Sequence, residues 1–244
     1  MPAPSVSMKR VVALCVAIGA LGIAGWLLKG LAKSKTFQVI GTLVDRVNTS
    51  ERVVALTLDD GPAQEMVSDV LATLEAKQVK ATFFATGEAL HDSPESGRKI
   101  VAAGHELGNH TWSHQHMVFK WPSVIRNEIE FTDAQIRAAG QQGDIYVRPP
   151  YGWKLFGLPF YLWRHGRTSV TWDTPADIDA SYVAGSSAAR AADVAARVRP
   201  GSIILLHVWS PSHNASFQLL GPLIDVVRAK GYRFVTVREL LALR

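Results

Sequence analysis

Short apolar runs alternate with amphipathic segments along most of the chain after about residue 41. Runs rich in β-branched and aromatic residues predict strands at Val53–Leu58, Ala81–Thr86, Ile145–Arg148, Ser169–Trp172, Ser202–His207 and Phe234–Thr236. Apolar residues at helical spacing predict helices at Gln64–Gln78, Glu95–Ala103, Pro122–Ala139, Ser187–Val198, Phe217–Lys230 and Val237–Leu243. This alternation is typical of a parallel sheet covered by helices, as an open doubly wound sheet or a (β/α) barrel. In both folds the active site lies at the carboxyl ends of the strands.

The N-terminal region has a different pattern. Val11–Leu28 carries no charge and is flanked by Lys9, Arg10 and Lys29. Its length fits a membrane-spanning helix and exceeds the usual apolar core of a signal peptide. We therefore expect an uncleaved signal anchor, although small residues near Ala24 leave a cleavable signal peptide open. The expected organisation is an anchor with basic flanks at 1–35, a connection at 36–52 and one domain at 53–244, exported and tethered to a membrane.

Composition narrows the class of protein. The chain has 244 residues, of which 48% are apolar and 19% charged, as in an ordinary globular protein. Its net charge of +5 comes without a dense basic stripe, so we expect no nucleic-acid partner. The single cysteine, Cys15, excludes an intramolecular disulfide and a zinc site built on several cysteines. The sequence does not indicate an oligomeric state.

Polar residues recur where the predicted strands end. Asp59 and Asp60 follow the first strand of the domain, and His207 follows an apolar run. His110 and His114, in "HTWSH", are four residues apart and would share one face if the segment were a helical turn, the alternative being two surface histidines on a loop. One Asp and two His make a three-ligand set for a divalent ion such as zinc, with a position left for water. A second Asp to remove a proton and a remote His to donate one would suit metal-assisted hydrolysis of an acyl bond.

These residues resemble the polysaccharide deacetylases of carbohydrate esterase family 4, the NodB-homology domain. The first family motif, Thr-Phe-Asp-Asp-Gly, appears as "TLDDG" with Leu58 in place of Phe, and the second is complete as "HTWSH". The third, Arg-Pro-Pro-Tyr-Gly, is complete from Arg148, and a Leu-His pair ends a strand at Leu206 and His207. The resemblance implies a distorted (β/α) barrel, usually with seven parallel strands, rather than the open sheet.

The resemblance also implies roles for the matched residues. Asp59 would be the catalytic base and Arg148 would orient it. Asp60, His110 and His114 would hold a divalent metal ion, for which zinc is the expected choice.

Further residues would contact the substrate. His207 would be the general acid for the departing amine. The backbone N–H of Tyr151, after Pro149 of the rigid "RPPYG" loop, would polarise the acetyl carbonyl. Leu206 would line the pocket for the acetyl methyl group, and the Trp172 ring would contact sugar.

The fourth family motif is where the sequence departs. The family carries a Trp followed by an Asp-Trp pair that supports the catalytic His, whereas this chain reads "TWDTPADIDA" from Thr171. Trp172 is present, and Asp173, Asp177 and Asp179 all remain candidates to support His207, with Asp177 preferred.

The expected activity is therefore removal of acetyl groups from N-acetylated sugars of an envelope or extracellular polysaccharide. Peptidoglycan, a chitin-like oligomer and an exopolysaccharide are all possible substrates, and O-acetyl esters are a close variant. The alternatives are a glycan-binding domain that has lost turnover and a membrane-anchored structural partner in an envelope assembly.

Overall fold

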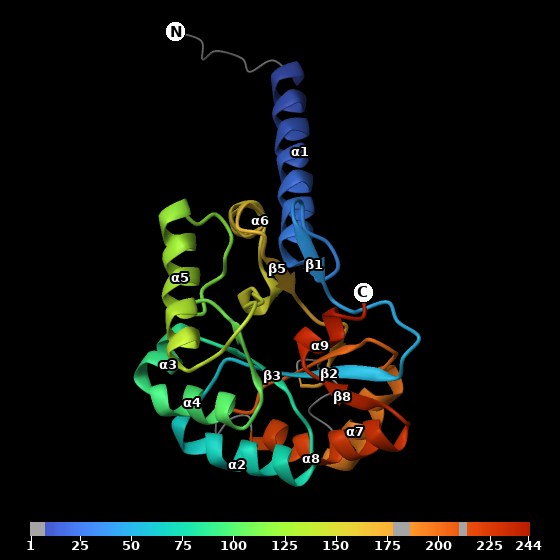
Figure 1. Cartoon of the computed structure of the whole chain (residues 1–244). Coiled ribbons are helices and arrows are strands. Elements are labelled where there is room, and N and C mark those ends of the chain that lie inside the picture. Colours follow the sequence, from blue (N-terminus) through green and yellow to red (C-terminus); the bar gives the residue numbers. More distant parts are fainter. Residues whose placement is uncertain (1–7, 178–185, 210–213) are drawn as a thin grey trace.

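A long N-terminal helix projects from a body of strands and helices in the computed structural model, which describes residues 8–177, 186–209 and 214–244 (Figure 1). The helices are α1 (Met8–Lys33), α2 (Gln64–Ala76), α3 (Gly87–Asp92), α4 (Pro94–Ala102), α5 (Pro122–Ala138), the 3₁₀ turn η1 (Pro150–Gly152), α6 (Gly157–Arg164), α7 (Ser187–Arg197), α8 (Asn214–Ala229) and α9 (Val237–Leu241). The strands are β1 (Thr42–Val44), β2 (Val53–Asp59), β3 (Thr82–Ala85), β4 (Glu106–Asn109), β5 (Thr168–Val170), β6 (Thr174–Pro175), β7 (Ile203–Leu206) and β8 (Arg233–Val235).

The strands pair in parallel around β2. Strand β7 lies on one side of β2, whereas β8 pairs with its first half and β3 with its second half. Strands β4 and β6 extend this six-stranded sheet beyond β3 and β7, and β1 and β5 form a second, two-stranded sheet. Single-residue bridges from Val147 to Asn109 and to Ser169 connect the two sheets. The α/β fold with parallel strands is confirmed, while barrel closure and the number of seven strands remain predictions.

The predicted elements and the observed ones differ where segments are short. All six predicted helices form, and five of the six predicted strands do. Residues 145–148 make only isolated bridges, through Val147. The strand β4 was not predicted because its sequence "ELGN" contains no β-branched residue, and α6 was not because "GLPFYLWR" includes Gly and Pro.

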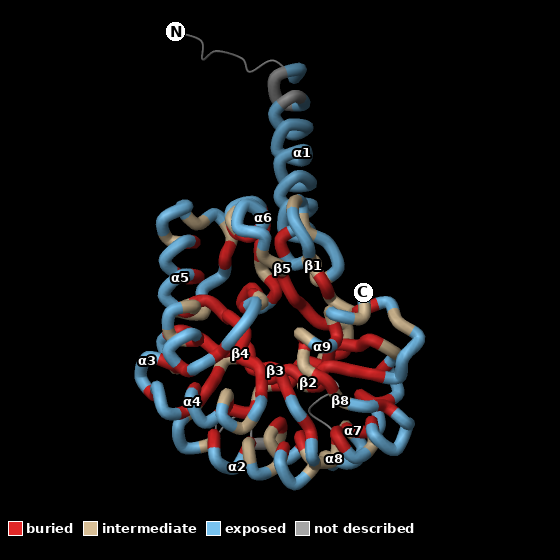
Figure 2. Tube along the Cα trace, in the orientation of Figure 1, coloured by how far each residue is buried: buried red, intermediate tan, exposed pale blue. Residues whose placement is uncertain are grey.

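Alternation along β2 decides which residues reach the site. Val54, Leu56 and Leu58 enter one core cluster, in which α2, α7 and α8 also take part. Val53 and Ala55 enter a second cluster on the opposite face of the strand. Because successive strand residues point to opposite faces, Thr57 and Asp59 share the face of Val53 and Ala55. All seven residues of β2 are buried, as the colouring of Figure 2 shows for the central strands.

Helix α1 is apolar and exposed along its length. Leu14–Lys33 has a mean hydropathy of 1.9, and only Ala32, near its end, is buried, so by length and composition it could cross a membrane. Its end is joined to the body, because the Lys154 N–H donates to the Ala32 carbonyl at 2.9 Å and the Thr171 hydroxyl to the Lys35 carbonyl at 2.5 Å. Strand β1, inside the segment 36–52, then pairs with β5.

Candidate active site

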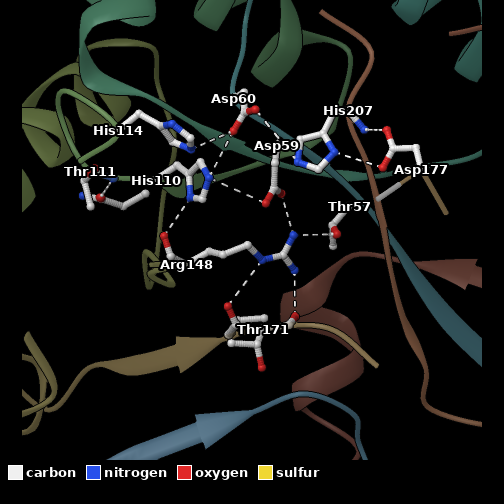
Figure 3. Close-up of polar contacts among 12 residues, drawn as sticks. Thr57, Asp59, Asp60, His110, Thr111, His114, Arg148, Thr171, Asp177 and His207 are labelled. Carbon is white, nitrogen blue, oxygen red and sulfur yellow. Dashed lines mark hydrogen bonds and ion pairs between the residues drawn. The ribbon is translucent and has the colours of Figure 1, made fainter. Parts of the chain in front are cut away.

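Asp59 is held by a buried arginine. The Arg148 side chain is fully buried, and its Nη1 donates to Asp59 Oδ1 at 2.5 Å and to Thr57 Oγ1 at 2.8 Å. Its Nη2 donates to the Thr171 carbonyl at 2.9 Å, and its guanidinium lies 3.9 Å from the centroid of the Phe84 ring. With its donors engaged in this way, Arg148 fixes the orientation of the carboxylate and offsets its charge. Figure 3 shows the two side chains meeting beneath the site.

Asp60 faces two imidazoles instead. It leaves the strand with a left-handed φ of 77°, and its Oδ1 lies 3.3 Å from His110 Nε2 and 3.0 Å from His114 Nε2 (Figure 3). The His110 Nδ1 pairs with the Arg148 carbonyl at 2.7 Å, which leaves Nε2 directed at the carboxylates. Burial acts to raise the pKa of Asp60, but His110 and His114 outweigh it and hold the pKa well below its usual range.

This trio fits a divalent cation. One ligand atom from each of Asp60, His110 and His114 lies within 4.8 Å of the other two. Asp60 Oδ1 is buried and, among the described residues, accepts no hydrogen bond of regular geometry. A carboxylate and two imidazoles form a donor set that metal ions such as zinc bind, with room for a further ligand. The residues present therefore fit a metal site.

The two histidines lie on a loop rather than on a helical turn, and the backbone of this loop brings them together. Left-handed φ angles of 65° at Thr111 and 55° at His114 curl the segment so that both imidazoles face Asp60. The buried carboxylate of Glu128, on α5, accepts hydrogen bonds from the N–H groups of Trp112 and Ser113 at 2.8 and 2.9 Å. The loop is thus shaped by a residue 14 positions beyond His114 in the sequence.

His207 lies on the other side of Asp60. The parallel register aligns Leu206 with Leu58, so the next residues, His207 and Asp59, lie at the same edge of the sheet. Asp177 Oδ1 lies 3.0 Å from His207 Nδ1, and Asp177 Oδ2 accepts the His207 backbone N–H at 2.7 Å. Burial acts to lower the pKa of His207, but the hydrogen bond and charge of Asp177 raise it to about 9. His207 Nε2 lies 3.9 Å from Asp60 Oδ2.

The structure distinguishes the three aspartates that the sequence left open. Asp177 contacts His207 through both carboxylate oxygens. Asp173 instead accepts hydrogen bonds from the Ile203 N–H at 3.0 Å and the Ser202 hydroxyl at 2.9 Å, at the start of β7. Asp179 lies outside the described residues.

These groups surround a cavity of about 230 Å³, lined by Lys35, Asp59, Asp60, His110, His114, Tyr151, Trp172, Leu205 and His207. Tyr151 has a left-handed φ of 57° and places its ring at the rim, 4.6 Å from the His114 ring. Pro149 is buried behind it and accepts the Gly152 N–H at 2.9 Å. Trp172 is buried, and its indole Nε1 has no hydrogen-bond partner in the described part of the chain.

One expected wall residue is corrected by the structure. Leu206 is fully buried in the core cluster with Leu56 and Leu58, and Leu205 lines the cavity in its place. The reason is the alternation along β7, which turns Leu205 to the face of Asp59 and Leu206 to the opposite face.

Sequence reasoning also missed residues that contact the site. Lys35 reaches the cavity from the end of α1, with its Nζ 4.6 Å from the centroid of the Trp172 ring. Thr57 is part of the strand "VVALTLD", where its hydroxyl supports Arg148. The alternation along β2 could have placed Thr57 beside Asp59, whereas no local signal marks Lys35.

Comparisons with known proteins agree with this geometry. Residues 46–155 match the family model described as Polysaccharide deacetylase. A peptidoglycan-N-acetylglucosamine deacetylase of Bacillus cereus is 32% identical over 75% of this chain and 66% of its own length. The chain thus spans about two thirds of that relative.

Solved structures show the same fold. A peptidoglycan N-acetylglucosamine deacetylase, in complex with an N-hydroxybenzamide, is 31% identical with a TM-score of 0.74, over 82% of this chain and 92% of that one. A family 4 acetyl xylan esterase from Clostridium thermocellum, in complex with a cobalt ion, is 35% identical with a TM-score of 0.69, over 78% and 91%. A mutant of a CE4 family pseudoenzyme with restored activity is 26% identical with a TM-score of 0.73, over 82% and 71%.

The motif residues meet at one edge of the sheet, a metal-compatible trio forms there, and the relatives match most of the chain. The chain therefore belongs to the polysaccharide deacetylase family of carbohydrate esterases.

Proposed function

We propose that the chain is a metal-dependent hydrolase that removes acetyl groups from N-acetylated sugars of an envelope polysaccharide, with peptidoglycan as the favoured substrate. The observation that carries the proposal is that two adjacent carboxylates at one cavity have different partners. Asp59 is fixed by Arg148, while Asp60 faces His110 and His114. The name of the Bacillus cereus relative favours peptidoglycan among the possible polymers.

The chain supplies both proton transfers of an amide hydrolysis. Asp60, His110 and His114 would hold the cation, zinc being our proposal, which supplies positive charge that polarises the acetyl carbonyl and makes water easier to deprotonate. Asp59 then accepts a proton from the water that attacks the carbonyl carbon. The N–H of Tyr151 stabilises the negative charge that develops on the carbonyl oxygen. His207, oriented by Asp177, donates a proton to the sugar nitrogen as the C–N bond breaks, so that acetate and a free amine leave.

The cavity walls account for the acetylated sugar as substrate. Leu205 provides an apolar contact for the acetyl methyl group, and the Trp172 ring forms a further wall of the cavity against the sugar. We propose in addition that α1 anchors the chain in a membrane, with 36–52 as the connection and 53–244 outside the cytoplasm.

Two conservative variants test the separation of roles. Asp59→Asn should abolish acetate release from an N-acetylated glycan while the metal content stays near that of the wild type. Asp60→Asn should lose both activity and metal. Loss of metal in Asp59→Asn with retention in Asp60→Asn would show that the two aspartates are reversed, and activity in both would reject the proposal.

An O-acetyl ester is the second candidate substrate, because one structural relative is an acetyl xylan esterase. Acetate release from acetylated xylan and from peptidoglycan, measured with the same protein, decides between the two. A chain that binds glycan and releases no acetate from either polymer would be a binding domain of the same fold.

A further inference from the structure

Exposed aromatic side chains gather around α6 and the start of α5. Phe119 and Trp121 are 82% and 79% exposed, far more than aromatic residues that belong to a core. The set, which we call the aromatic face, consists of Phe37, Phe119, Trp121, Phe156, Phe160 and Trp163. An exposed apolar group of this size marks a surface that contacts something other than water.

The three segments that carry the aromatic face are neighbours. A side chain at Gly157, the first residue of α6, would meet Ile125 of α5 at 2.6 Å and the Lys120 carbonyl at 3.6 Å. One at Gly41, in the segment that follows α1, would meet the Trp163 Cβ at 3.1 Å. Figure 1 shows α6 and the upper end of α5 at the end of the body from which α1 projects, level with the lower turns of α1. In Figure 2 α1 is mainly exposed, and α6 combines exposed with buried residues.

The three segments that carry the aromatic face contain only basic charges, while Glu130 and Asp133 of the neighbouring α5 contact Tyr161 and Arg167. Residues 26–41, 117–126 and 153–167 contain no Asp or Glu. Their basic residues with exposed or partly exposed side chains are Lys29, Lys33, Lys35, Lys120, Arg126 and Arg164. Lys154 is buried, and Arg167 pairs with Asp133. Aromatic rings interleaved with basic side chains are the combination that binds the interface of a membrane with anionic lipids.

We propose that the aromatic face binds the surface of the membrane that α1 spans, and so holds the catalytic cavity next to that surface. The inference rests on the proposed anchoring by α1. The apolar span ends at Lys33, and Lys35, two residues later, already lines the cavity. Because hydrogen bonds to Ala32 and Lys35 join α1 to the body, the cavity cannot move far from the membrane. The substrate class is then an acetylated glycan that is tethered to the membrane or lies against it.

Two other occupants fit less well. Sugar subsites would have to continue from the catalytic cavity, yet none of the six residues of the aromatic face lines it. A second copy of the chain would have to cover the basic residues of these segments with the same basic residues, since the segments themselves contain no Asp or Glu.

Nitroxide labels on the full chain, reconstituted in vesicles of phosphatidylethanolamine and phosphatidylglycerol, test the inference. In a Cys15→Ser background, Ser123→Cys places a label on the first turn of α5, and Ser68→Cys places one on α2. Both serines are exposed, and α2 lies at the opposite end of the body (Figure 1). Oxygen concentrates in lipid and a nickel chelate stays in water, so the ratio of nitroxide relaxation by oxygen to relaxation by the chelate reports contact with the membrane. This ratio should be higher for the label at 123 than for the label at 68. Phe119→Ser with Trp121→Ser should abolish this difference.

The remaining outcomes test the anchoring by α1, the membrane contact of the aromatic face and the catalytic proposal separately. A label on Cys15 of the otherwise unchanged chain reports whether α1 is in lipid, and a label in water there would overturn the inference together with the anchoring. If the label on Cys15 lies in lipid but the labels at 123 and 68 are equally accessible to water, the inference alone is overturned. Spin–spin broadening between labels at 123 would also overturn it, because it would show that two copies of the chain meet at this face. Acetate release from a soluble chitooligosaccharide should be unchanged in the Phe119→Ser, Trp121→Ser variant. If no variant releases acetate, the catalytic proposal fails, while a lipid signal at 123 still supports the membrane surface.

Discussion

Asp59 and Asp60 are adjacent in the sequence, yet their carboxylates have different partners. The pleat of β2 turns Asp59 toward the buried Arg148, and the left-handed φ of Asp60 turns the next side chain toward His110 and His114. Repulsion between the neighbours is offset because each has a cationic or metal-binding partner. The sequence motifs could predict the identities of these partners but not the geometry, since the partners come from two other segments of the chain.

Asp177 provides a test at the scale of one residue. Asp177→Asn should lower kcat by about 100-fold, because His207 loses the charge that orients it and keeps it protonated. Metal content and KM should change little. Steady-state rates of acetate release measure the effect.

Asp173→Asn is the matched control, since Asp173 contacts Ser202 and Ile203 at the start of β7 and not His207. It should lower the melting temperature with kcat nearly unchanged. Equal losses of kcat in the two variants would contradict the assignment of Asp177.

At the scale of elements, the site depends on how strands and helices shape the loops between them. Alternation along β2 and β7 is a property of any strand, so the inward face of Thr57, Asp59 and Leu205 was open to prediction. The expectation for Leu206 was wrong because it followed the motif and not the strand alternation. The curled His110–His114 loop was not predictable, because it depends on a carboxylate from α5.

Glu128 tests the control of that loop by α5. Glu128→Gln should weaken metal affinity by about 10- to 100-fold, since the hydrogen bonds that hold Trp112 and Ser113 lose a charged acceptor. Competition with a chelator measures the affinity. Glu130→Gln, an exposed position on the same helix, should leave the affinity unchanged. Wild-type affinity in Glu128→Gln would show that the loop keeps its shape without the negative charge of Glu128.

The alternation along β7 gives a paired prediction. Leu206→Ala should reduce the free energy of unfolding by about 2–5 kcal/mol, because it opens a hole in the core. Leu205→Ala should instead raise KM or lower kcat, because it removes a wall of the cavity. Denaturant unfolding and steady-state kinetics on both variants distinguish loss of stability from loss of substrate contact. If Leu205→Ala lowers only the stability, Leu205 does not contact the substrate.

At the scale of the whole molecule, the periodic pattern predicted the parallel α/β arrangement and six of the helices that cover it. Gly104, Gly140 and Gly231 end three of them with φ angles of 78°, 100° and 83°. Short strands such as β6 depend on neighbours distant in the sequence, so their own residues carry little signal. The entry of Lys35 into the cavity, at the junction of α1 with the body, likewise depends on the assembled fold.

His105 links the stability of the assembled fold to pH. Burial lowers its pKa from 6.5 to about 4, so between these values the unfolded chain binds more protons than the folded one. Stability should therefore fall as the pH falls from 6.5 to 4, by about 3 kcal/mol in all. His105→Asn, whose amide oxygen can accept the Ala81 N–H as the imidazole does, should flatten this part of the profile. Urea unfolding at several pH values measures the free energy of unfolding. If this free energy depends on pH as steeply in the variant as in the wild type, groups other than His105 cause the dependence.

The central claim is that Asp60, His110 and His114 hold the ion on which hydrolysis depends. The most direct measurement is acetate release from an N-acetylated glycan by chelator-treated protein during titration with zinc. The account predicts activity near background before zinc is added and a plateau at about one ion per chain. Full activity of the metal-depleted protein would contradict it.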